Sequence, residues 1–196
     1  TINGAVAPLG ARVSPGDDVR CSGHPVTAQQ FVYLLLHKPT GYVCSRRRQG
    51  DTPTIYELLP TNHHQLKPVG RLDKDSSGLL LLTNDGDFAF RMTHPSFKKQ
   101  KRYLVTLERP LEPLHRQMIS DFGVDLPDGR SQLTLTRQSD GDDTRWVVEM
   151  SEGRNRQIRR TFSALGYTVT KLHRTDFGNY SLGDISRGTF REVNIS

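Results

Sequence analysis

The sequence predicts an α+β fold organised around a largely antiparallel sheet. Several short segments alternate apolar and polar residues with a period of two, which is the pattern of strands with one buried face. Few segments carry helix signals, and strands and helices do not alternate regularly, which favours this class over a parallel βαβ arrangement. The length of 196 residues suits one substantial domain with a small appendage.

The appendage comes first in the chain. Residues 1–26 predict short strands separated by turns, one at Asn3-Gly4 and another at 15–18 between Arg12-Val13 and Val19-Arg20. This segment is too small to fold alone, and a polar connection at 25–30 follows it. We therefore expect one domain over residues 1–28 and a second over 29–196. Because the sequence begins with Thr, we expect the native N-terminus to lie upstream.

The larger domain begins with the apolar run 31–36, whose β-branched and aromatic residues predict a buried strand. Residues 79–83 lie between Gly78 and a turn at 84–86, and their length favours a second buried strand over a helix. Alternation or β-rich composition predicts further strands at 103–107, around Leu133 and Leu135, around Trp146 and Val148, and at 167–172.

Two helices are expected in this domain. The segment 54–59 follows Pro53, a residue favoured in the first turn of a helix. Ile158, Phe162 and Leu165 are spaced as one face of a helix, and Gly166 is a typical stop signal. The second helix is therefore predicted over residues 155–165.

Composition limits the classes of function. The hydrophobic fraction is 34% and no stretch approaches the roughly 18 apolar residues of a membrane span, so we expect none. The net charge of +6 and pI of about 9.5 suit a polyanionic partner such as nucleic acid. Cys21 and Cys44 are too few for a disulfide framework, which favours a reducing, cytoplasmic location.

The most informative segment is the charged loop 70–78, which leads directly into the apolar strand 79–83. Such a junction can hold a carboxylate at a pocket wall, and Asp73 and Asp75 are the candidates. Spacing alone leaves open a solvated loop with local Arg–Asp pairs, or a glycosidase-like carboxylate pair. An Mg²⁺ site is less consistent with a cationic chain that offers few further acidic ligands.

Three basic clusters, at 46–48, 98–102 and 152–160, favour RNA or DNA as the partner. The last cluster opens the predicted helix, where guanidinium groups and backbone N–H groups together suit phosphates. Each cluster alone could also be a solvated face, and Tyr103 could be a core residue or a stacking platform for a base. No zinc-ligand spacing and no nucleotide-binding glycine loop is present, so no metal and no cofactor is expected.

With these motifs in place, the chain resembles the bacterial ribosomal RNA pseudouridine synthases over roughly residues 31–193. The resemblance is carried by the long motif 70–86 and, in order around it, by 36–41, 101–105, 152–160 and 172–174. Residues 1–26 resemble the second half of the small ribosomal-S4-like RNA-binding domain that precedes many members. The resemblance implies the pseudouridine synthase fold, with a mixed, largely antiparallel sheet in two subdomains flanked by helices.

The resemblance also implies the reaction and its residues. A uridine would be flipped out of the RNA, its N1–C1′ bond broken, and C5 joined to C1′, without metal or cofactor. Asp73 would be the catalytic carboxylate, acting as a nucleophile or as a base. Arg159 would pair with Asp73 and hold it ionised, and Tyr103 would pack on the uracil and could take the C5 proton. The residues expected to bind substrate or RNA are Arg71, Ile158, Leu172, Arg154, Arg156, Arg160 and Lys101.

Finer expectations follow from the same likeness. Asp75 would be structural, with Lys74 or Arg71 as its cation, and Asn155-Arg156 favours 23S over 16S ribosomal RNA as the substrate. Ribosomal assembly intermediates are possible partners, and a monomer is expected. The alternative is a catalytically silent RNA-binding or ribosome-assembly module, while a nuclease would need a metal cluster or a histidine acid.

Overall fold

The computed structural model describes residues 1–26 and 30–195, and the chain separates into two compact units. The small unit spans Thr1–Phe31 and the large unit Val32–Ser196. Part of the connection predicted at 25–30 lies outside the described residues. The assignment of the small unit to a ribosomal-S4-like domain stays a prediction.

The small unit is held together by backbone pairing rather than by a core. Strand β1 (Arg20–Cys21) pairs with β2 (His24–Pro25), and Ile2 forms isolated bridges to Ala5 and Val19. The turn at Asn3-Gly4 is present, with both residues at positive φ. The strand predicted at Arg12-Val13 is absent, because that segment has no ladder partner among the described residues and its side chains are exposed.

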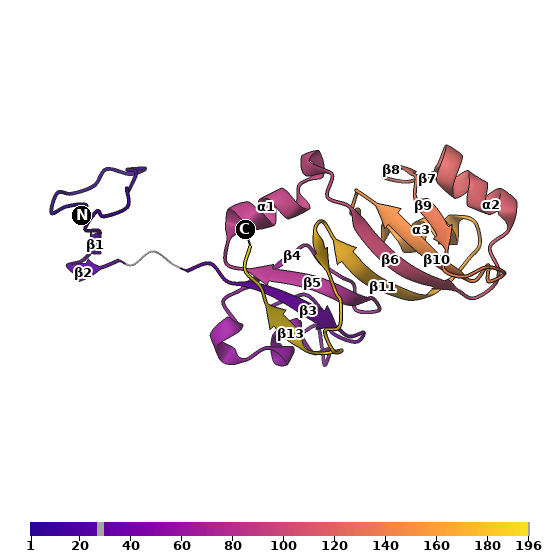
Figure 1. Cartoon of the computed structure of the whole chain (residues 1–196), viewed down its shortest axis with the longest axis horizontal. Coiled ribbons are helices and arrows are strands. Elements are labelled where there is room, and N and C mark those ends of the chain that lie inside the picture. The colour runs from indigo at the N-terminus through magenta and orange to yellow at the C-terminus, as the bar shows by residue number, and fades with distance from the viewer. Residues whose placement is uncertain (27–29, 196) are drawn as a thin grey trace. The chain divides into compact units, whose positions relative to one another are not determined.

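Among the described residues, one sheet of nine strands forms the large unit, with the order β13-β3-β5-β11-β6-β10-β9 and with β4 and β12 paired to β5 and β11 (Figure 1). Every described pair in it is antiparallel except β5–β11. Its strands are β3 (Tyr33–Lys38), β4 (Lys67–Val69), β5 (Ser77–Thr83), β6 (Lys101–Leu107), β9 (Thr134–Arg137), β10 (Arg145–Met150), β11 (Val169–Phe177), β12 (Tyr180–Ser181) and β13 (Phe190–Glu192). A separate hairpin joins β7 (Val124–Leu126) to β8 (Gly129–Ser131). The expected α+β class and antiparallel sheet are confirmed.

The helices are short and lie at the ends and on the faces of this sheet. They are α1 (Gly86–Thr93), α2 (Pro113–Gln117) and α3 (Gln157–Ala164), with shorter helical turns at Ile55–Leu58, Thr61–His63, Pro95–Phe97 and Met118–Phe122. No helix in the described part of the chain is long and apolar enough to span a membrane.

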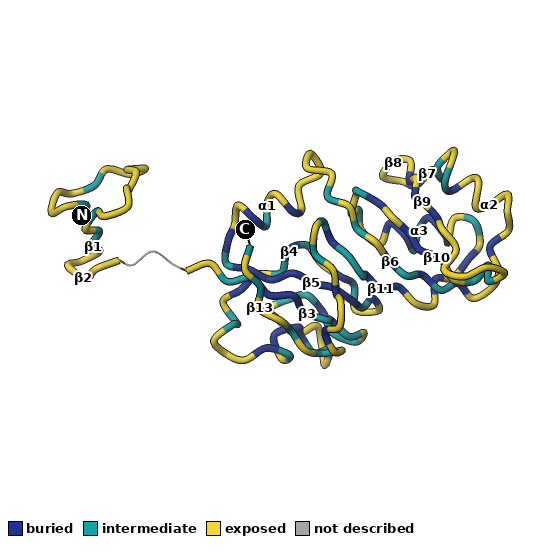
Figure 2. Tube along the Cα trace, viewed as in Figure 1, coloured by how far each residue is buried: buried dark blue, intermediate teal, exposed yellow. Residues whose placement is uncertain are grey.

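The core explains why residues 79–82 are four consecutive leucines. Leu80 and Leu82 pack into the larger hydrophobic cluster on one face of the sheet, whereas Leu79 and Leu81 pack into a second cluster on the other face. Strand β5 is therefore buried on both sides, and Figure 2 shows the buried residues following the central strands. Alternate side chains point to opposite faces, so a strand buried on both needs a continuous apolar run.

The close contact between β5 and β11 requires Gly78. Its φ is +108°, and a Cβ atom there would lie 2.1 Å from the carbonyl oxygen of Arg174. Only glycine allows this conformation and this approach. The contact also fixes the end of the charged loop, because β5 begins directly after residues 70–76.

The predicted helices differ in detail from those observed. Helix α3 begins at Gln157 rather than 155, because Arg156 takes a left-handed conformation with φ of 46°. The segment 54–59 forms only a 3-10 turn at Ile55–Leu58. Helix α1 was not expected: Asp85-Gly86 has the pattern of a turn, but the Asp85 carboxylate accepts from the backbone N–H of Phe88 and caps a helix.

Candidate active site

A pocket of about 290 Å³ opens where the loop 70–76, strand β6, the loop before α3 and strand β11 meet. Its volume is near the lower end for small-molecule sites. Eight of the predicted site residues line it: Arg71, Asp73, Lys101, Tyr103, Arg154, Arg156, Ile158 and Leu172. Arg159 and Arg160 are not part of its lining. Segments more than 80 residues apart in the sequence thus converge on one cavity.

The loop 70–76, here called the Asp73 loop, is anchored by a buried lysine. The Lys38 ammonium group donates to the carbonyl oxygens of Pro39 (3.0 Å), Asp73 (3.0 Å) and Ser76 (2.7 Å), and the side chain is fully buried. Burial lowers the pKa of Lys38 to about 8. Sequence reasoning did not assign Lys38 to the site, although it lies within the motif 36–41.

The ion pairs of the two aspartates differ from those expected. Asp73 Oδ2 lies 3.5 Å from Arg156 Nη1, and the two Nη atoms of Arg156 each donate to one carboxylate oxygen of Asp75 at 3.0 Å. Arg159 Nε lies 3.3 Å from Asp75 Oδ2. The prediction that Arg159 pairs with Asp73 is therefore wrong in this structure, and so is the choice of Lys74 or Arg71 as the partner of Asp75.

The reason lies in how Arg159 is held. Its Nη1 donates to Val169 O at 2.7 Å and its Nη2 to Asp75 O at 2.9 Å, so the guanidinium connects the Asp73 loop to strand β11. Burial raises the pKa of the Asp75 carboxyl, but Arg156 and Arg159 outweigh it and bring that pKa below its ordinary value. Asp75 thus joins the loop to α3 through two arginines, whereas Asp73, whose side chain is 34% exposed, has one ion-pair partner among the described residues.

Tyr103, Ile158 and Leu172 form the apolar part of the wall. They come from β6, α3 and β11 and are exposed by 8%, 4% and 8%, respectively. Tyr103 belongs to the hydrophobic core and also faces the pocket, so the two interpretations of this residue are compatible. An aromatic ring and two aliphatic side chains beside a carboxylate suit a flat, mostly apolar ring such as a nucleobase.

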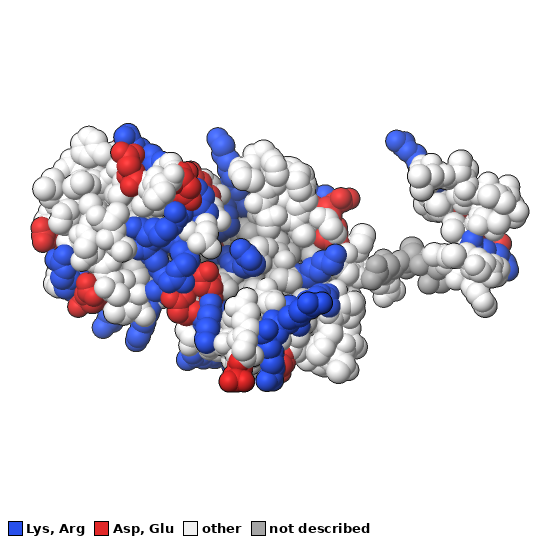
Figure 3. Space-filling model, turned by 180° about the vertical axis from the view of Figure 1, so that it is seen from behind, with Lys and Arg blue, Asp and Glu red and all other residues white. Residues whose placement is uncertain are grey.

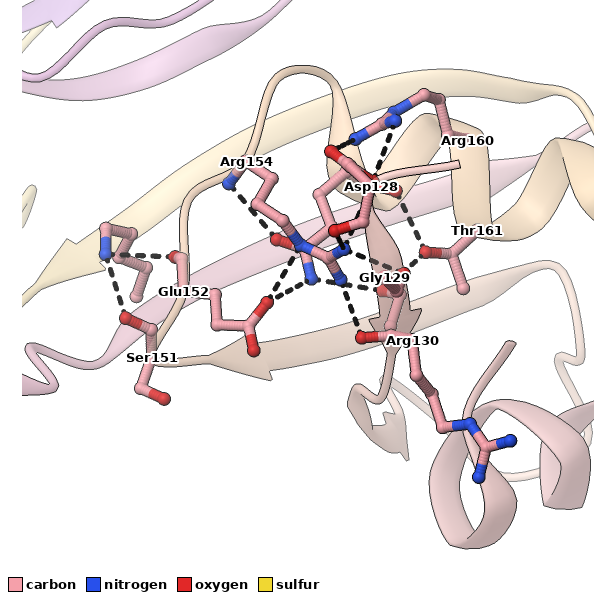
Figure 4. Close-up of polar contacts among 11 residues, drawn as sticks. Asp128, Gly129, Arg130, Ser151, Glu152, Arg154, Arg160 and Thr161 are labelled. Carbon is pink, nitrogen blue, oxygen red and sulfur yellow. Dashed lines mark hydrogen bonds and ion pairs between the residues drawn. The ribbon is translucent and has the colours of Figure 1, made fainter. Parts of the chain in front are cut away.

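Arg154 has a different environment from the phosphate site expected of it. Its Nη1 donates to Asp128 O and Oδ1 (both 3.1 Å) and to Gly129 O (2.8 Å), and its Nη2 donates to Arg130 O (2.8 Å). Its Nε donates to Glu152 Oε2 at 3.1 Å. Figure 4 shows the guanidinium enclosed by these acceptors. The structure thus gives Arg154 the role of holding the β7–β8 turn, in place of the expected phosphate contact.

The side chains of Arg160 and Lys101 are also bound to acceptors within the protein. The Nη atoms of Arg160 contact the Asp128 carboxylate at 3.1 and 2.7 Å. The Lys101 ammonium group donates to the carbonyl oxygens of Lys99, Ser151 and Glu152. Burial and, to a smaller extent, the charge of Arg174 together lower the pKa of Lys101 to about 8. The Arg160 Nη atoms and the Lys101 ammonium group are therefore bound within the protein, whereas Arg160 Nε is buried without a hydrogen-bond partner among the described residues.

In the basic cluster 46–48, two arginines are bound to acceptors within the protein and one is exposed. Arg46 donates to the carbonyl oxygens of His64 and Gln65, and Arg48 pairs with Glu57 at 2.6 Å, while Arg47 is exposed. On the face shown in Figure 3, Lys and Arg side chains gather around a hollow in the large unit, with fewer acidic side chains among them. The basic surface expected from the sequence is present, but many of its members also hold loops in place.

Comparison with known proteins identifies the family. Residues 32–164 match the RNA pseudouridylate synthases. The chain is 40% identical to ribosomal small subunit pseudouridine synthase A of Yersinia pestis, covering 98% of this chain and 83% of the relative. It is 32% identical to ribosomal large subunit pseudouridine synthase B of Bacillus subtilis (strain 168), covering 98% and 80%. A crystal structure of a pseudouridylate synthase superposes with a TM-score of 0.77 at 33% identity, covering 99% of this chain and 84% of that one. The chain therefore belongs to the RNA pseudouridylate synthase family.

Proposed function

We propose that the protein converts one uridine of ribosomal RNA to pseudouridine, with Asp73 as the catalytic carboxylate. The observation that carries this proposal is the position of Asp73: a partly exposed carboxylate in a pocket whose walls are Tyr103, Ile158 and Leu172. The relatives named above carry ribosomal subunits in their names, which supports ribosomal RNA as the substrate.

The pocket suggests how the reaction proceeds. A flipped uracil lies between Tyr103 and the aliphatic side chains, and Arg71, exposed at the rim, fills the space that the base leaves in the RNA. Asp73 then acts on the sugar or the base while the N1–C1′ bond breaks, the uracil turns, and C5 bonds to C1′. The C5 proton leaves to a base, for which Tyr103 is the candidate.

The cations divide into three roles in this proposal. Arg156, exposed at the pocket edge, is placed to exchange its contact with Asp73 for an RNA phosphate. Arg159 is a positioning residue that acts through Asp75 on the Asp73 loop. Arg154, Arg160 and Lys101 support the rim from within, and any RNA contact they make requires exchange of existing hydrogen bonds.

The choice of ribosomal subunit stays a prediction. The Asn155-Arg156 pair favours 23S ribosomal RNA, but relatives of both kinds, small-subunit and large-subunit, match nearly the full chain. Pseudouridine mapping of both ribosomal RNAs from a deletion strain identifies the uridine: the modification at one position should disappear and return with the wild-type gene.

The catalytic assignment is tested with Asp73→Asn. We expect it to abolish tritium release from [5-³H]uridine-labelled ribosomal RNA while RNA affinity stays close to wild type, because the variant keeps the shape and the backbone contacts of the residue. Asp184→Asn, at an exposed ion pair with Arg191, is the control and should release tritium normally. Wild-type release by Asp73→Asn contradicts the assignment. Tight RNA binding without release by the wild-type protein favours the silent RNA-binding alternative.

A further inference from the structure

Arg174 on strand β11 is a buried cation in the pocket wall that the reaction scheme above does not use. The residue is 2% exposed, and its Nε donates to Leu79 O at 2.8 Å. Its Nη2 is buried and has no hydrogen-bond partner in the described part of the chain. Its guanidinium carbon lies 4.9 Å from the centre of the Phe177 ring. A buried guanidinium with an unpaired donor is costly, which calls for an explanation.

Two lysines beside the pocket do not share this feature, and Arg159 Nε, which is also buried without a hydrogen bond among the described residues, lies 3.3 Å from the Asp75 carboxylate. Lys38 is buried and Lys101 is partly buried near the pocket, and each ammonium group donates to three backbone carbonyl oxygens. Burial lowers the pKa of both lysines, and the charge of Arg174 lowers each of them further. This end of the pocket therefore combines excess positive charge with a donor that lacks an acceptor.

A second unpaired polar group lies beside Arg174. Ser76 is 1% exposed and lines the same pocket, and its hydroxyl is buried without a hydrogen-bond partner among the described residues. The parallel pairing of Ser77 with His173 and of Gly78 with Arg174 brings the start of β5 next to this arginine. One wall of the pocket thus offers a guanidinium donor and a hydroxyl that can donate or accept.

Uracil has the complementary groups. Its O2 and O4 are acceptors and its N3–H is a donor, and a base that enters between Tyr103 and Leu172 brings this edge to the polar wall. Phosphate is a poorer match for Arg174, because the phosphates of a flipped nucleotide stay at the rim, where exposed cations such as Arg71 lie.

We propose that Arg174 donates a hydrogen bond to a carbonyl oxygen of the flipped uracil and stabilises the negative charge that the base gains during isomerisation; this rests on the proposed function. When the N1–C1′ bond breaks, its electron pair stays with the uracil and spreads over N1, O2 and O4. The C5=C6 π electrons then form the C5–C1′ bond while the N1 pair moves into an N1=C6 bond; loss of the C5 proton restores C5=C6, and N1 gains a proton. A preorganised cation at the carbonyl oxygen is worth most while this charge exists. The Ser76 hydroxyl accepts from N3–H.

The test couples a protein change to a change of the base. The substrate is an RNA fragment around the mapped uridine, prepared with uridine, 2-thiouridine or 4-thiouridine at the target, because sulfur is a weaker acceptor than oxygen. We expect Arg174→Met to lower the single-turnover rate of pseudouridine formation by about 10²-fold or more, with RNA affinity within about 3-fold of wild type. One of the two thio substitutions should slow the wild-type enzyme about 10-fold and should not slow Arg174→Met further.

Two control variants keep the outcomes separate. Arg174→Lys retains a cation and should recover part of the rate, whereas Arg191→Met, at an exposed ion pair, should match wild type. Should Arg174→Met not fold in thermal melting, the comparison moves to Arg174→Lys, whose response to the thio substitution must be smaller than that of the wild type. A wild-type rate in Arg174→Met, or equal thio effects in variant and wild type, overturns the inference alone. A wild-type protein that forms no pseudouridine in either ribosomal RNA overturns the proposed function.

Discussion

Replacing Arg154 with alanine is expected to destabilise the fold rather than to weaken RNA binding directly. The guanidinium donates to four oxygen atoms of residues 128–130 and to Glu152, and 22% of the side chain is exposed. Each hydrogen bond contributes about 0.5–1.5 kcal/mol net. Because water replaces part of them in the variant, we expect a loss of about 2–3 kcal/mol in the free energy of unfolding. For a chain of this size that corresponds to a fall of about 5–10 °C in Tm.

Two measurements decide between this expectation and a phosphate contact. Urea denaturation should show the loss of stability, and the salt dependence of RNA binding should keep its wild-type slope. An Arg154 that binds phosphate instead predicts a flatter slope, with about one counterion fewer released. Arg47→Ala is the control, since this exposed arginine should change stability by less than about 0.5 kcal/mol. Wild-type stability together with a flatter slope refutes the structural role.

Two further predictions concern residues near the pocket. Burial, with Arg174 acting in the same direction, lowers the pKa of Lys101 from 10.5 to about 8. Between pH 8 and pH 10.5 the folded protein therefore binds fewer protons than the unfolded chain, so its stability rises with pH. Urea denaturation across this window should show a shallower rise in stability for Lys101→Met than for the wild type, and identical slopes contradict the expectation. Gly78→Ala places a Cβ 2.1 Å from Arg174 O and should lower the free energy of unfolding by more than about 4 kcal/mol. The control Gly86→Ala, with open space around its Cβ, should fold normally in thermal melting. A stable Gly78→Ala protein would mean that β5 and β11 can separate at little cost in free energy.

Local patterns in the sequence were sufficient for the central strands. The run 79–83 has an apolar composition and flanking turn signals that together specify a buried strand, and β5 is found there. The start of α3 was predicted less accurately because Arg156 is left-handed and pairs with Asp73 and Asp75, which lie about 80 residues away in the sequence and which no local pattern connects to it. Helix α1 was missed because Asp85-Gly86 fits a turn and a helix cap equally well.

The candidate site was predictable where a motif names residues, and less so where partners must be chosen. The sequence places Asp73, Tyr103 and Leu172 in one family pattern, and the fold brings all three to one pocket. The sequence does not show that Asp128, in a turn distant in sequence, forms ion pairs with Arg154 and Arg160. Long-range ion pairs depend on tertiary geometry, and periodicity or composition contains no information about them.

The lysine that anchors the Asp73 loop determines which side chains of the site can be replaced without changing the conformation of the loop. All three acceptors of the Lys38 ammonium group are main-chain oxygens. The hydrogen bonds that hold the loop therefore do not depend on which side chains stand at positions 73 and 76. The carboxylate proposed as catalytic and the scaffold beneath it are in this sense separable. Replacing the Asp73 carboxylate with another chemical group should leave the loop in place. This makes the pocket a suitable starting point for engineering a different reaction on a flipped base.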